Sequence, residues 1–264
     1  MYFAGIDIGS LATKVCIVDD CERIAGYLID RTGARVREIG KTVLENCIRN
    51  LDIMKNEIAY VIATGYGRNL ALSGTADEKV TEITCHARGA KKLFENCHTV
   101  IDIGGQDSKV MRLDDSGKVV NFTMNDKCAA GTGKFLEVLA STLGIELNEM
   151  GEMAVKSETP VEITSVCTVF AESEVISLLA EGREVRDIVA GLHRAIAKRV
   201  SGLVRQIGIA EDVVMTGGVA KNKGVVKALE DEIGVRINIP DEPQIVGAYG
   251  AGIIARERFL RKVH

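Results

Sequence analysis

Two copies of one segment occur in this chain, and the repeat constrains the fold more than any other feature of the sequence. IDIGSLATKVCIVDD (residues 6–20) aligns without a gap to IDIGGQDSKVMRLDD (residues 101–115). A repeat of this length indicates two copies of one structural unit. Each copy is an apolar strand that runs into an aspartate and glycines. We therefore expect two similar halves with a cleft between them, lined by ligands for phosphate and metal ions.

Composition is consistent with two lobes and excludes several classes of protein. The chain has 264 residues, near the size at which one core splits into two, and 46% of them are hydrophobic. The net charge of -4 shows no basic bias toward nucleic acid or anionic lipid. No apolar run reaches the roughly 20 residues that span a membrane, and the start MYFAGIDIG lacks the features of a signal peptide. We expect a cytoplasmic protein whose seven cysteines are reduced thiols or metal ligands.

The hydrophobic pattern predicts strands that alternate with helices, in two similar sets. Strands are expected at residues 2–8, 14–19, 23–28 and 58–64, and again at 99–103, 109–113, 119–124 and 212–216. Helices are expected at residues 36–51, 82–94 and 185–207, and from about Gln244 onward. The expected lobes are residues 1–97, joined by the C-terminal helix 247–264, and residues 98–246.

The residues after each IDIG indicate how phosphate would be held. In a dinucleotide-binding fold the glycine turn opens a helix, whereas the segments from Lys14 and Lys109 read as strands. Phosphates would then meet the backbone N–H groups of a hairpin, which glycine lets an anion approach. Asp7 and Asp102, each at a strand end, are suited to bind Mg²⁺ through its waters. A single Asp-x-Gly is also an ordinary turn, but its duplication favours a functional pair.

A third glycine motif completes the pattern. The run VVMTGGVAKN (residues 213–222) predicts a buried strand that ends in Gly217 and Gly218, at the carboxyl edge where open α/β sheets bind ligands. The three motifs together resemble the actin, Hsp70 and sugar-kinase ATPase superfamily. The resemblance implies an α/β, two-lobed, actin/Hsp70-like (ribonuclease H-like) fold with a duplicated mixed β-sheet and flanking helices.

This resemblance assigns roles to residues of the three motifs. Mg²⁺ binding and catalysis fall to Asp7 and Asp102. The phosphate region would include Ser10, Thr13, Lys14, Gly104, Gly105 and Gln106, and the nucleoside side Gly217, Gly218 and Asn222. Gln106 is also a catalytic candidate, because a glutamine orients the attacking water in some GTPases. It could equally bind phosphate.

One tempting motif is rejected. Residues 131–134 (GTGK) look like the end of a P-loop, but Cys128 stands where the first glycine is required. Phe135 replaces the hydroxyl residue that would bind Mg²⁺. The segment instead places Cys128 just before a helix start, where free backbone amides favour a thiolate or a cluster sulfur.

Cys167 also precedes an expected helix, and the pair Cys128 and Cys167 is a candidate set of metal ligands. Spacing alone is a weak argument, because the two lie 39 residues apart without a C-x-x-C and buried cysteines are usually small apolar residues. An iron–sulfur cubane needs four thiolates, so a chain with two good ligands would have to dimerise. Cys16, Cys21, Cys47, Cys85 and Cys97 read as incidental, and Glu172 and Glu174 near Cys167 as structural or interface residues.

Longer strings make the resemblance specific. ATGYGRN (63–69), TCHARGA (84–90), VIDIGGQDSKV (100–110), MNDKCAAGTGKFLEV (124–138), CTVFAESEVIS (167–177) and MTGGVAKN (215–222) resemble the ATP-dependent activators (component A, archerases) of 2-hydroxyacyl-CoA dehydratases. The wider group includes the ATPase subunits of benzoyl-CoA reductases. The resemblance implies a homodimer with one bridging [4Fe-4S] cluster, held by Cys128 and Cys167 of each subunit. ATP hydrolysis to ADP would drive one electron from ferredoxin or flavodoxin to an iron–sulfur partner.

Two departures from this pattern keep the acceptor open. Residues 28–40 lack the Gly/Thr/Ser-rich loop of dehydratase activators, and Leu11 stands where a small hydroxyl residue is common. The acceptor could therefore be a double-cubane cluster protein, or the chain a benzoyl-CoA reductase-type ATPase subunit. A sugar or acyl kinase, or a non-redox nucleotide switch, would share the ATP motifs without needing the two cysteines.

Overall fold

The structure, a computed structural model, describes residues 1–72, 74–165 and 167–263. The chain forms two compact units, each built around a five-stranded sheet. Unit 1 comprises Met1–Val100, Leu113–Val120 and Pro240–His264, and unit 2 comprises Ile101–Arg112 and Asn121–Ile239. The turn at 113–120 groups with unit 1 because it packs on a helix there. A Cβ atom on Gly117 would lie 2.7 Å from the side chain of Lys91.

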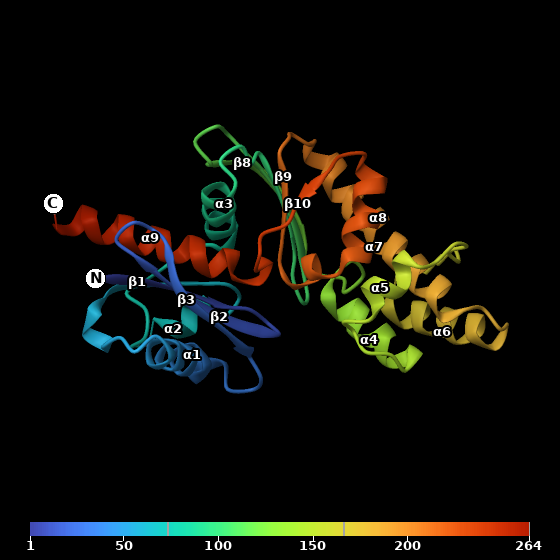
Figure 1. Cartoon of the computed structure of the whole chain (residues 1–264), viewed down its shortest axis with the longest axis horizontal. Coiled ribbons are helices and arrows are strands. Elements are labelled where there is room, and N and C mark those ends of the chain that lie inside the picture. Colours follow the sequence, from blue (N-terminus) through green and yellow to red (C-terminus); the bar gives the residue numbers. More distant parts are fainter. Residues whose placement is uncertain (73, 166, 264) are drawn as a thin grey trace. The chain divides into compact units, whose positions relative to one another are not determined.

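The sheet of unit 1 gathers three strand ends at Asp7. Its strands are β1 (Tyr2–Ile8), β2 (Ala12–Asp19), β3 (Ile24–Arg31), β4 (Ile58–Thr64) and β5 (Glu78–Lys79), in the order β3-β2-β1-β4-β5 (Figure 1). β1, β2 and β3 form an antiparallel meander, whereas β4 runs parallel to β1 and β5 parallel to β4. In this register Asp7 pairs with Lys14 of β2 and with Thr64 of β4.

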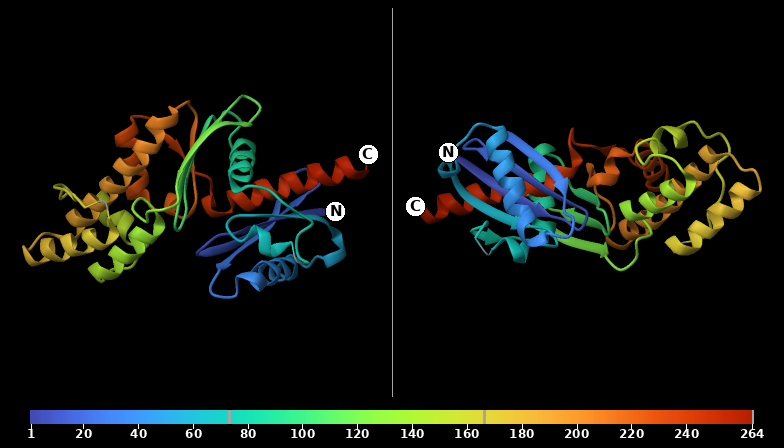
Figure 2. Two further views of the ribbon diagram at one scale, coloured as in Figure 1. Left: turned by 180° about the vertical axis from the view of Figure 1, so that it is seen from behind. Right: turned by 90° about the horizontal axis from the view of Figure 1, so that it is seen from below.

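Helices cover both faces of this sheet (Figures 1 and 2). They are α1 (Val36–Asn50), α2 (Arg68–Ala71), α3 (Glu82–Leu93) and α9 (Val246–Val263), with short 3-10 turns η1 (Lys55–Glu57) and η3 (Pro243–Ile245). α1 packs on one face of the sheet, whereas α9 lies against β1 and α3 in a separate apolar cluster. Glycine permits the close approach, because a Cβ on Gly250 would lie 1.8 Å from the carbonyl oxygen of Cys85.

Unit 2 repeats the same sheet. Its strands are β6 (Thr99–Ile103), β7 (Ser108–Leu113), β8 (Val119–Asn125), β9 (Val213–Thr216) and β10 (Ile237–Asn238), in the order β10-β9-β6-β7-β8. Read from the other edge, this is the order of unit 1, with β6 in the place of β1, β7 in that of β2 and β9 in that of β4. β9 and β10 are parallel, as β4 and β5 are. The repeat seen in the sequence is therefore a repeat of the whole sheet.

The helices of unit 2 form a single core around α7. They are α4 (Gly133–Leu143), α5 (Met150–Val155), α6 (Thr168–Ala180), α7 (Val185–Ile207) and α8 (Lys223–Ile233), with the 3-10 turn η2 (Gly218–Lys221). The apolar stripe predicted for residues 185–207 is buried along α7, as Leu192, Ile196 and Val200 show. None of the helices in the described part of the chain is both long and apolar enough to cross a membrane.

Element boundaries differ from the sequence predictions at a few ends. β2 begins at Ala12 rather than Lys14, because the amide of Gly9 donates to the carbonyl of Ala12 at 3.1 Å and closes a tight hairpin. β3 extends to Arg31, since Ala12 pairs with Arg31 in the ladder. The helix expected from about Gln244 is the 3-10 turn η3 followed by α9.

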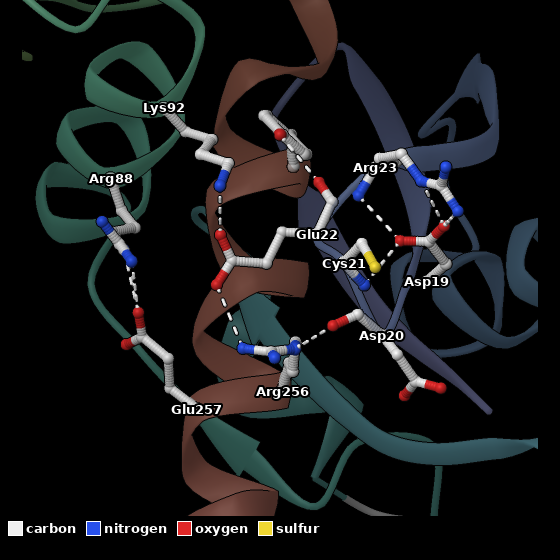
Figure 3. A network of polar contacts seen from close by, with 10 residues as sticks. Asp19, Asp20, Cys21, Glu22, Arg23, Arg88, Lys92, Arg256 and Glu257 are labelled. Atoms are coloured by element: carbon white, nitrogen blue, oxygen red, sulfur yellow. Dashed lines mark hydrogen bonds and ion pairs between the residues drawn. The ribbon is translucent and has the colours of Figure 1, made fainter.

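Charged side chains fix the β2–β3 turn to α3 and α9 within unit 1 (Figure 3). The carboxylate of Glu22 accepts hydrogen bonds from Lys92 of α3 and Arg256 of α9. The Tyr249 hydroxyl donates to the carbonyl of Glu22 at 2.9 Å, and Arg256 Nε donates to that of Asp20 at 2.7 Å. Backbone and side-chain acceptors of the turn are thus both engaged, which holds the meander on the helix pair.

Candidate functional site

The first carboxylate predicted to bind Mg²⁺ ends β1 in unit 1. Asp7 is buried, and its Oδ2 accepts a 2.8 Å hydrogen bond from Nζ of Lys14. The hairpin between them turns at Gly9, where a Cβ atom would lie 2.8 Å from the carbonyl oxygen of Ala12 and 3.1 Å from Nζ of Lys14. Only glycine fits this turn. The hairpin therefore presents a carboxylate and an ammonium group side by side.

Gly65 closes the other side of this carboxylate, a role that sequence reasoning missed. It follows Thr64 at the end of β4, with a φ of +84° that favours glycine. A Cβ atom there would lie 2.3 Å from Oδ1 of Asp7 and 2.7 Å from the carbonyl oxygen of Ile8. The signal was present in the sequence, because Thr64-Gly65 after one strand matches Thr216-Gly217 after another.

Unit 2 holds the same constellation with its own residues. Asp102 is buried at the end of β6, and its Oδ2 lies 3.4 Å from Nζ of Lys109. Its Oδ1 accepts a 2.9 Å hydrogen bond from the hydroxyl of Thr216, at the end of β9. Gly217 has a φ of +86°, and a Cβ there would lie 2.3 Å from the carbonyl oxygen of Ile103. Each unit thus surrounds one carboxylate with a lysine and a Thr-Gly strand end.

The two copies differ in charge. Lys109 also pairs with Asp107 at 2.8 Å, so one ammonium group faces two carboxylates in unit 2. Ala12 occupies the place of Asp107 in the first copy, where Lys14 faces Asp7. The net negative charge around Asp102 favours a divalent cation, since oxygen ligands with excess negative charge are what Mg²⁺ prefers.

The other residues predicted to contact phosphate lie in the same two hairpins. Ser10 is half-buried in the β1–β2 hairpin, and Gly104 and Gly105 are half-buried in the β6–β7 hairpin. The Gly104 amide donates to the carbonyl of Asp107 at 2.9 Å, as Gly9 does to Ala12. Gln106 is exposed at the tip of its hairpin. Gly218 is exposed at the start of η2, next to the buried Gly217.

Two predicted nucleotide contacts have side chains engaged within their own unit. The Thr13 and Thr32 hydroxyls are 3.0 Å apart, and Thr32 donates to the carbonyl of Gly9 at 2.7 Å. Asn222 caps α8, because its Oδ1 accepts from the amides of Gly224 and Val225 at 3.0 and 3.1 Å. Both side chains hold glycine loops in shape, and a direct contact with nucleotide stays a prediction for each.

A buried histidine supports the third glycine motif. His193 of α7 is 1% exposed, and its Nε2 lies 3.2 Å from Nδ2 of Asn222. Because the Asn222 amide nitrogen is a donor, Nε2 is the acceptor and the ring proton is assigned to Nδ1. Burial lowers the pKa of His193 to about 4. The ring is therefore neutral near pH 7 and accepts this hydrogen bond.

Burial separates the cysteines into two groups. Cys16, Cys47, Cys85 and Cys97 are buried. Burial raises the pKa of Cys47 to about 11 and that of Cys85 to about 12, so neither forms a thiolate near neutral pH. Cys21 and Cys167 are exposed and Cys128 is half-buried. These three thiols are the ones that a metal or cluster could reach in the described part of the chain.

Cys128 and Cys167 lie in the same unit, next to two helices that pack together. Cys167 is the N-cap residue of α6, and Cys128 precedes α4 by a short loop. α4 and α6 lie side by side in Figures 1 and 2, and the Thr142 hydroxyl of α4 donates to Glu172 of α6 at 3.1 Å. Asn125 Nδ2 donates to the carbonyl of Cys128 at 2.8 Å. Cys21 lies in unit 1 instead.

The glycine hairpin of unit 2 is bonded directly to the start of α4. The amide of Gly133 donates to the carbonyl of Gly104 at 2.9 Å, and that of Lys134 to the carbonyl of Gly105 at 2.8 Å. A P-loop would offer these amides to phosphate. Lys134 Nζ pairs instead with Glu137 at 3.2 Å. The geometry supports rejecting the Walker motif and makes the hairpin and the Cys128 loop one connected structure.

Duplicated sheets and paired glycine hairpins place the protein in the α/β fold of the actin, Hsp70 and sugar-kinase ATPases, as the sequence predicted. Residues 4–255 match the BadF/BadG/BcrA/BcrD ATPase family, so the chain belongs to that family and is an ATPase. A distant structural likeness, at 12% identity and a TM-score of 0.62 over 97% of this chain and 100% of the other, is to a ROK family glucokinase from Streptomyces griseus. That likeness shows the fold alone.

Closer relatives share nearly the whole chain. The (R)-2-hydroxyglutaryl-CoA dehydratase activating ATPase of Acidaminococcus fermentans is 46% identical over 258 residues, 98% of either sequence. The crystal structure of component A of that organism's dehydratase superposes with a TM-score of 0.95 at 46% identity, covering 98% of this chain and 99% of the other. The activator of 2-hydroxyisocaproyl-CoA dehydratase from Clostridium difficile, solved with bound ADPNP, superposes with a TM-score of 0.93 at 44% identity, covering 100% and 97%.

Gly217 should tolerate no side chain. We expect Gly217→Ala to lower the free energy of unfolding by at least about 2 kcal/mol more than Gly144→Ala, and to weaken ATP binding at least about tenfold. Gly144 is a matched control, because its φ is also positive, at +67°, but a Cβ there would meet nothing within 4 Å. Urea denaturation and nucleotide titration measure both quantities. Equal losses in the two variants would show that the carbonyl of Ile103 does not restrict this position.

His193 should make stability fall at acidic pH. Its pKa of about 4 in the folded state lies below the ordinary 6.5, so between these values the unfolded chain binds more protons and stability rises with pH. Relative to His193→Gln, the wild type should lose about 2 kcal/mol of unfolding free energy between pH 7.5 and 5. Urea denaturation of both proteins at the two pH values measures this difference. Parallel losses in both would contradict a neutral buried imidazole.

Proposed function

We propose that this ATPase is an iron–sulfur electron-transfer activator of a 2-hydroxyacyl-CoA dehydratase-like enzyme. Two near-full-length relatives are named as dehydratase activators, and the protein with bound ADPNP is one of them. The observation that carries the proposal is the pair of hydrogen bonds from the first turn of α4 to Gly104 and Gly105. They join the hairpin expected to hold phosphate to the loop of Cys128.

The donor chemistry of unit 2 fits a cluster. An iron–sulfur cluster needs thiolates, and Cys128 and Cys167 are accessible thiols beside helix N-termini, whose dipoles favour negative sulfur. One chain offers two such ligands in this unit, so we propose a homodimer with one [4Fe-4S] cluster held by both residues of each subunit. When bound, the cluster carries one electron at low potential.

Exposed apolar side chains beside Cys167 support the homodimer. Val169, Phe170 and Ile176 of α6 are 66%, 68% and 55% exposed. Large apolar residues that gather on one short helix are unfavourable in water and typical of surfaces that meet a partner. Their position next to Cys167 places the proposed subunit interface around the proposed cluster ligands.

We assign the nucleotide to the two hairpins and the third glycine motif. Asp7 and Asp102 would hold Mg²⁺ through its waters, while Lys14 and the hairpin amides near Ser10, Gly104 and Gly105 would meet phosphate. Gln106, exposed at its hairpin tip, is free to orient the attacking water or to bind phosphate. Gly217, Gly218 and Asn222 would line the nucleoside side, Asn222 through the loop that it caps.

ATP turnover would act on the cysteines through α4. Because Gly104 and Gly105 are bonded to the amides of Gly133 and Lys134, a shift of the hairpin displaces the start of α4. The same displacement changes the solvent exposure and hydrogen bonding around Cys128. Exposure and hydrogen bonds to sulfur set the reduction potential of a cluster ligated there.

The partners follow from the same proposal. The acceptor would be an iron–sulfur dehydratase, in line with the names of the relatives, and a double-cubane cluster protein is the alternative acceptor. Ferredoxin or flavodoxin would supply the electron. All of these act in the cytoplasm, where we place the protein.

Anaerobic purification tests the proposal. The wild type should be a brown dimer with about four irons per dimer, and the double variant Cys128→Ser, Cys167→Ser should be colourless while it still binds ATP. Cys21→Ser is the matched control, since Cys21 is an equally accessible thiol in unit 1, and it should keep its iron. Iron analysis, visible absorption and nucleotide titration give the three readouts. A double variant that retains the iron of the wild type would sink the cluster assignment.

A further inference from the structure

The segment that leads into Cys167 is held by a single carboxylate of α6. Oε1 of Glu174 accepts hydrogen bonds from the amide and from the hydroxyl of Thr164, both at 2.9 Å. Oε2 accepts from the amide of Ser165, also at 2.9 Å. Glu174 lies on the helix that Cys167 begins, so the helix reaches back over two turns to its own entry segment.

The upstream part of the same segment is fixed to a different helix. Asp187 of α7 accepts hydrogen bonds from the hydroxyls of Ser157 and Thr159 at 2.6 and 3.0 Å. The amide of Val161 donates to the carbonyl of Asp187 at 3.0 Å, and a Cβ on Gly191 would lie 2.1 Å from the carbonyl oxygen of Val161. Residues 157–161 are thus anchored on α7. Glu174 ties the last turn before Cys167 to α6.

The geometry uses both carboxylate oxygens, which makes the residue type specific. Hydrogen bonds to an ionised acceptor are stronger than neutral ones. A glutamine could present its oxygen to Thr164, but its NH₂ group would then face the N–H donor of Ser165. Charge and shape therefore both favour glutamate at position 174.

Cys128 has a counterpart of this clamp. Asn125 Nδ2 donates to the carbonyl of Cys128 at 2.8 Å and to that of Ala130 at 3.4 Å. Each of the two cysteines assigned to the cluster therefore adjoins a segment held by one polar side chain. Cys21, the remaining accessible thiol, is held through its own amide, which donates to Asp19 at 2.8 Å in a short turn.

We propose that Glu174 is the positioning residue for Cys167. By holding Thr164 and Ser165 against α6, it fixes the direction in which the chain enters the helix and so the place of the Cys167 sulfur. The inference rests on the proposed function for its ligand, because the ordered thiol matters only if it binds a cluster. Its mechanical part, the clamp itself, stands on the three hydrogen bonds.

Glu174→Gln tests the proposal, with Glu172→Gln as the matched control on the same helix. Glu172 accepts only from Thr142 of α4 among the hydrogen bonds described, so the control removes a nearby charge without touching the segment. In Glu174→Gln we expect the Ser165 amide to exchange with deuterium about tenfold faster, and iron to pass to a chelator about tenfold faster. The electron paramagnetic resonance spectrum of the reduced cluster should shift. The control should match the wild type in all three.

A graded variant keeps the test valid if Glu174→Gln does not fold. Thr164→Val removes only the hydroxyl bond to Oε1 and should change the same readouts in the same direction by a smaller factor. Unchanged Ser165 exchange in both variants would overturn the clamp. Faster exchange with an unaltered spectrum and iron release would show that the clamp does not position Cys167.

The proposed function can fail without ending this test. If the wild type holds no iron, the rate of alkylation of Cys167 relative to Cys21 in the same sample replaces the cluster readouts. A ratio that changes in Glu174→Gln and not in Glu172→Gln supports positioning of the thiol. An unchanged ratio overturns the proposal.

Discussion

Two backbone hydrogen bonds, from the amides of Gly133 and Lys134 to the carbonyls of Gly104 and Gly105, connect the parts of unit 2 on which its function depends. They occupy helix-start amides that would otherwise be free to bind an anion. The hydroxyl of Ser108 adds a third tie, to the carbonyl of Gly131 at 2.5 Å. A glycine hairpin that elsewhere would serve phosphate alone is thereby made part of the loop that carries Cys128.

The duplicated sheet explains why one hairpin acquired this connection and the other did not. Both copies keep the carboxylate, the lysine and the Thr-Gly strand end, so both can face a nucleotide with the same chemistry. After β3 the chain enters α1, which packs on its own sheet, whereas after β8 it enters the Cys128 loop and α4. Asp107 adds a second carboxylate beside Lys109 in this copy alone. Unit 2 thus combines the more acidic hairpin with both candidate cluster ligands.

The sequence predicted the repeated strands, the helical stripe of α7 and the fold class, because these depend on local periodicity and on the repeat itself. It did not predict the role of Gly65, whose contact with Asp7 exists only because β4 pairs in parallel with β1. Nor could it separate buried from accessible cysteines, since burial is set by packing between distant segments. The engagement of Thr13 with Thr32 and the clamp of Glu174 are likewise tertiary contacts. The residues of the hairpins were readable, whereas their partners across the sheet were not.

The central claim is that nucleotide at the Gly104–Gly105 hairpin is felt at Cys128. The most direct measurement is the alkylation rate of Cys128 in cluster-free protein saturated with ADP or with a non-hydrolysable ATP analogue, with Cys21 in unit 1 as the internal reference. The account predicts that the rate at Cys128 differs at least about fivefold between the two states while that at Cys21 does not, as a coupling of 1 kcal/mol or more requires. Equal rates at Cys128 with both nucleotides demonstrably bound would contradict it.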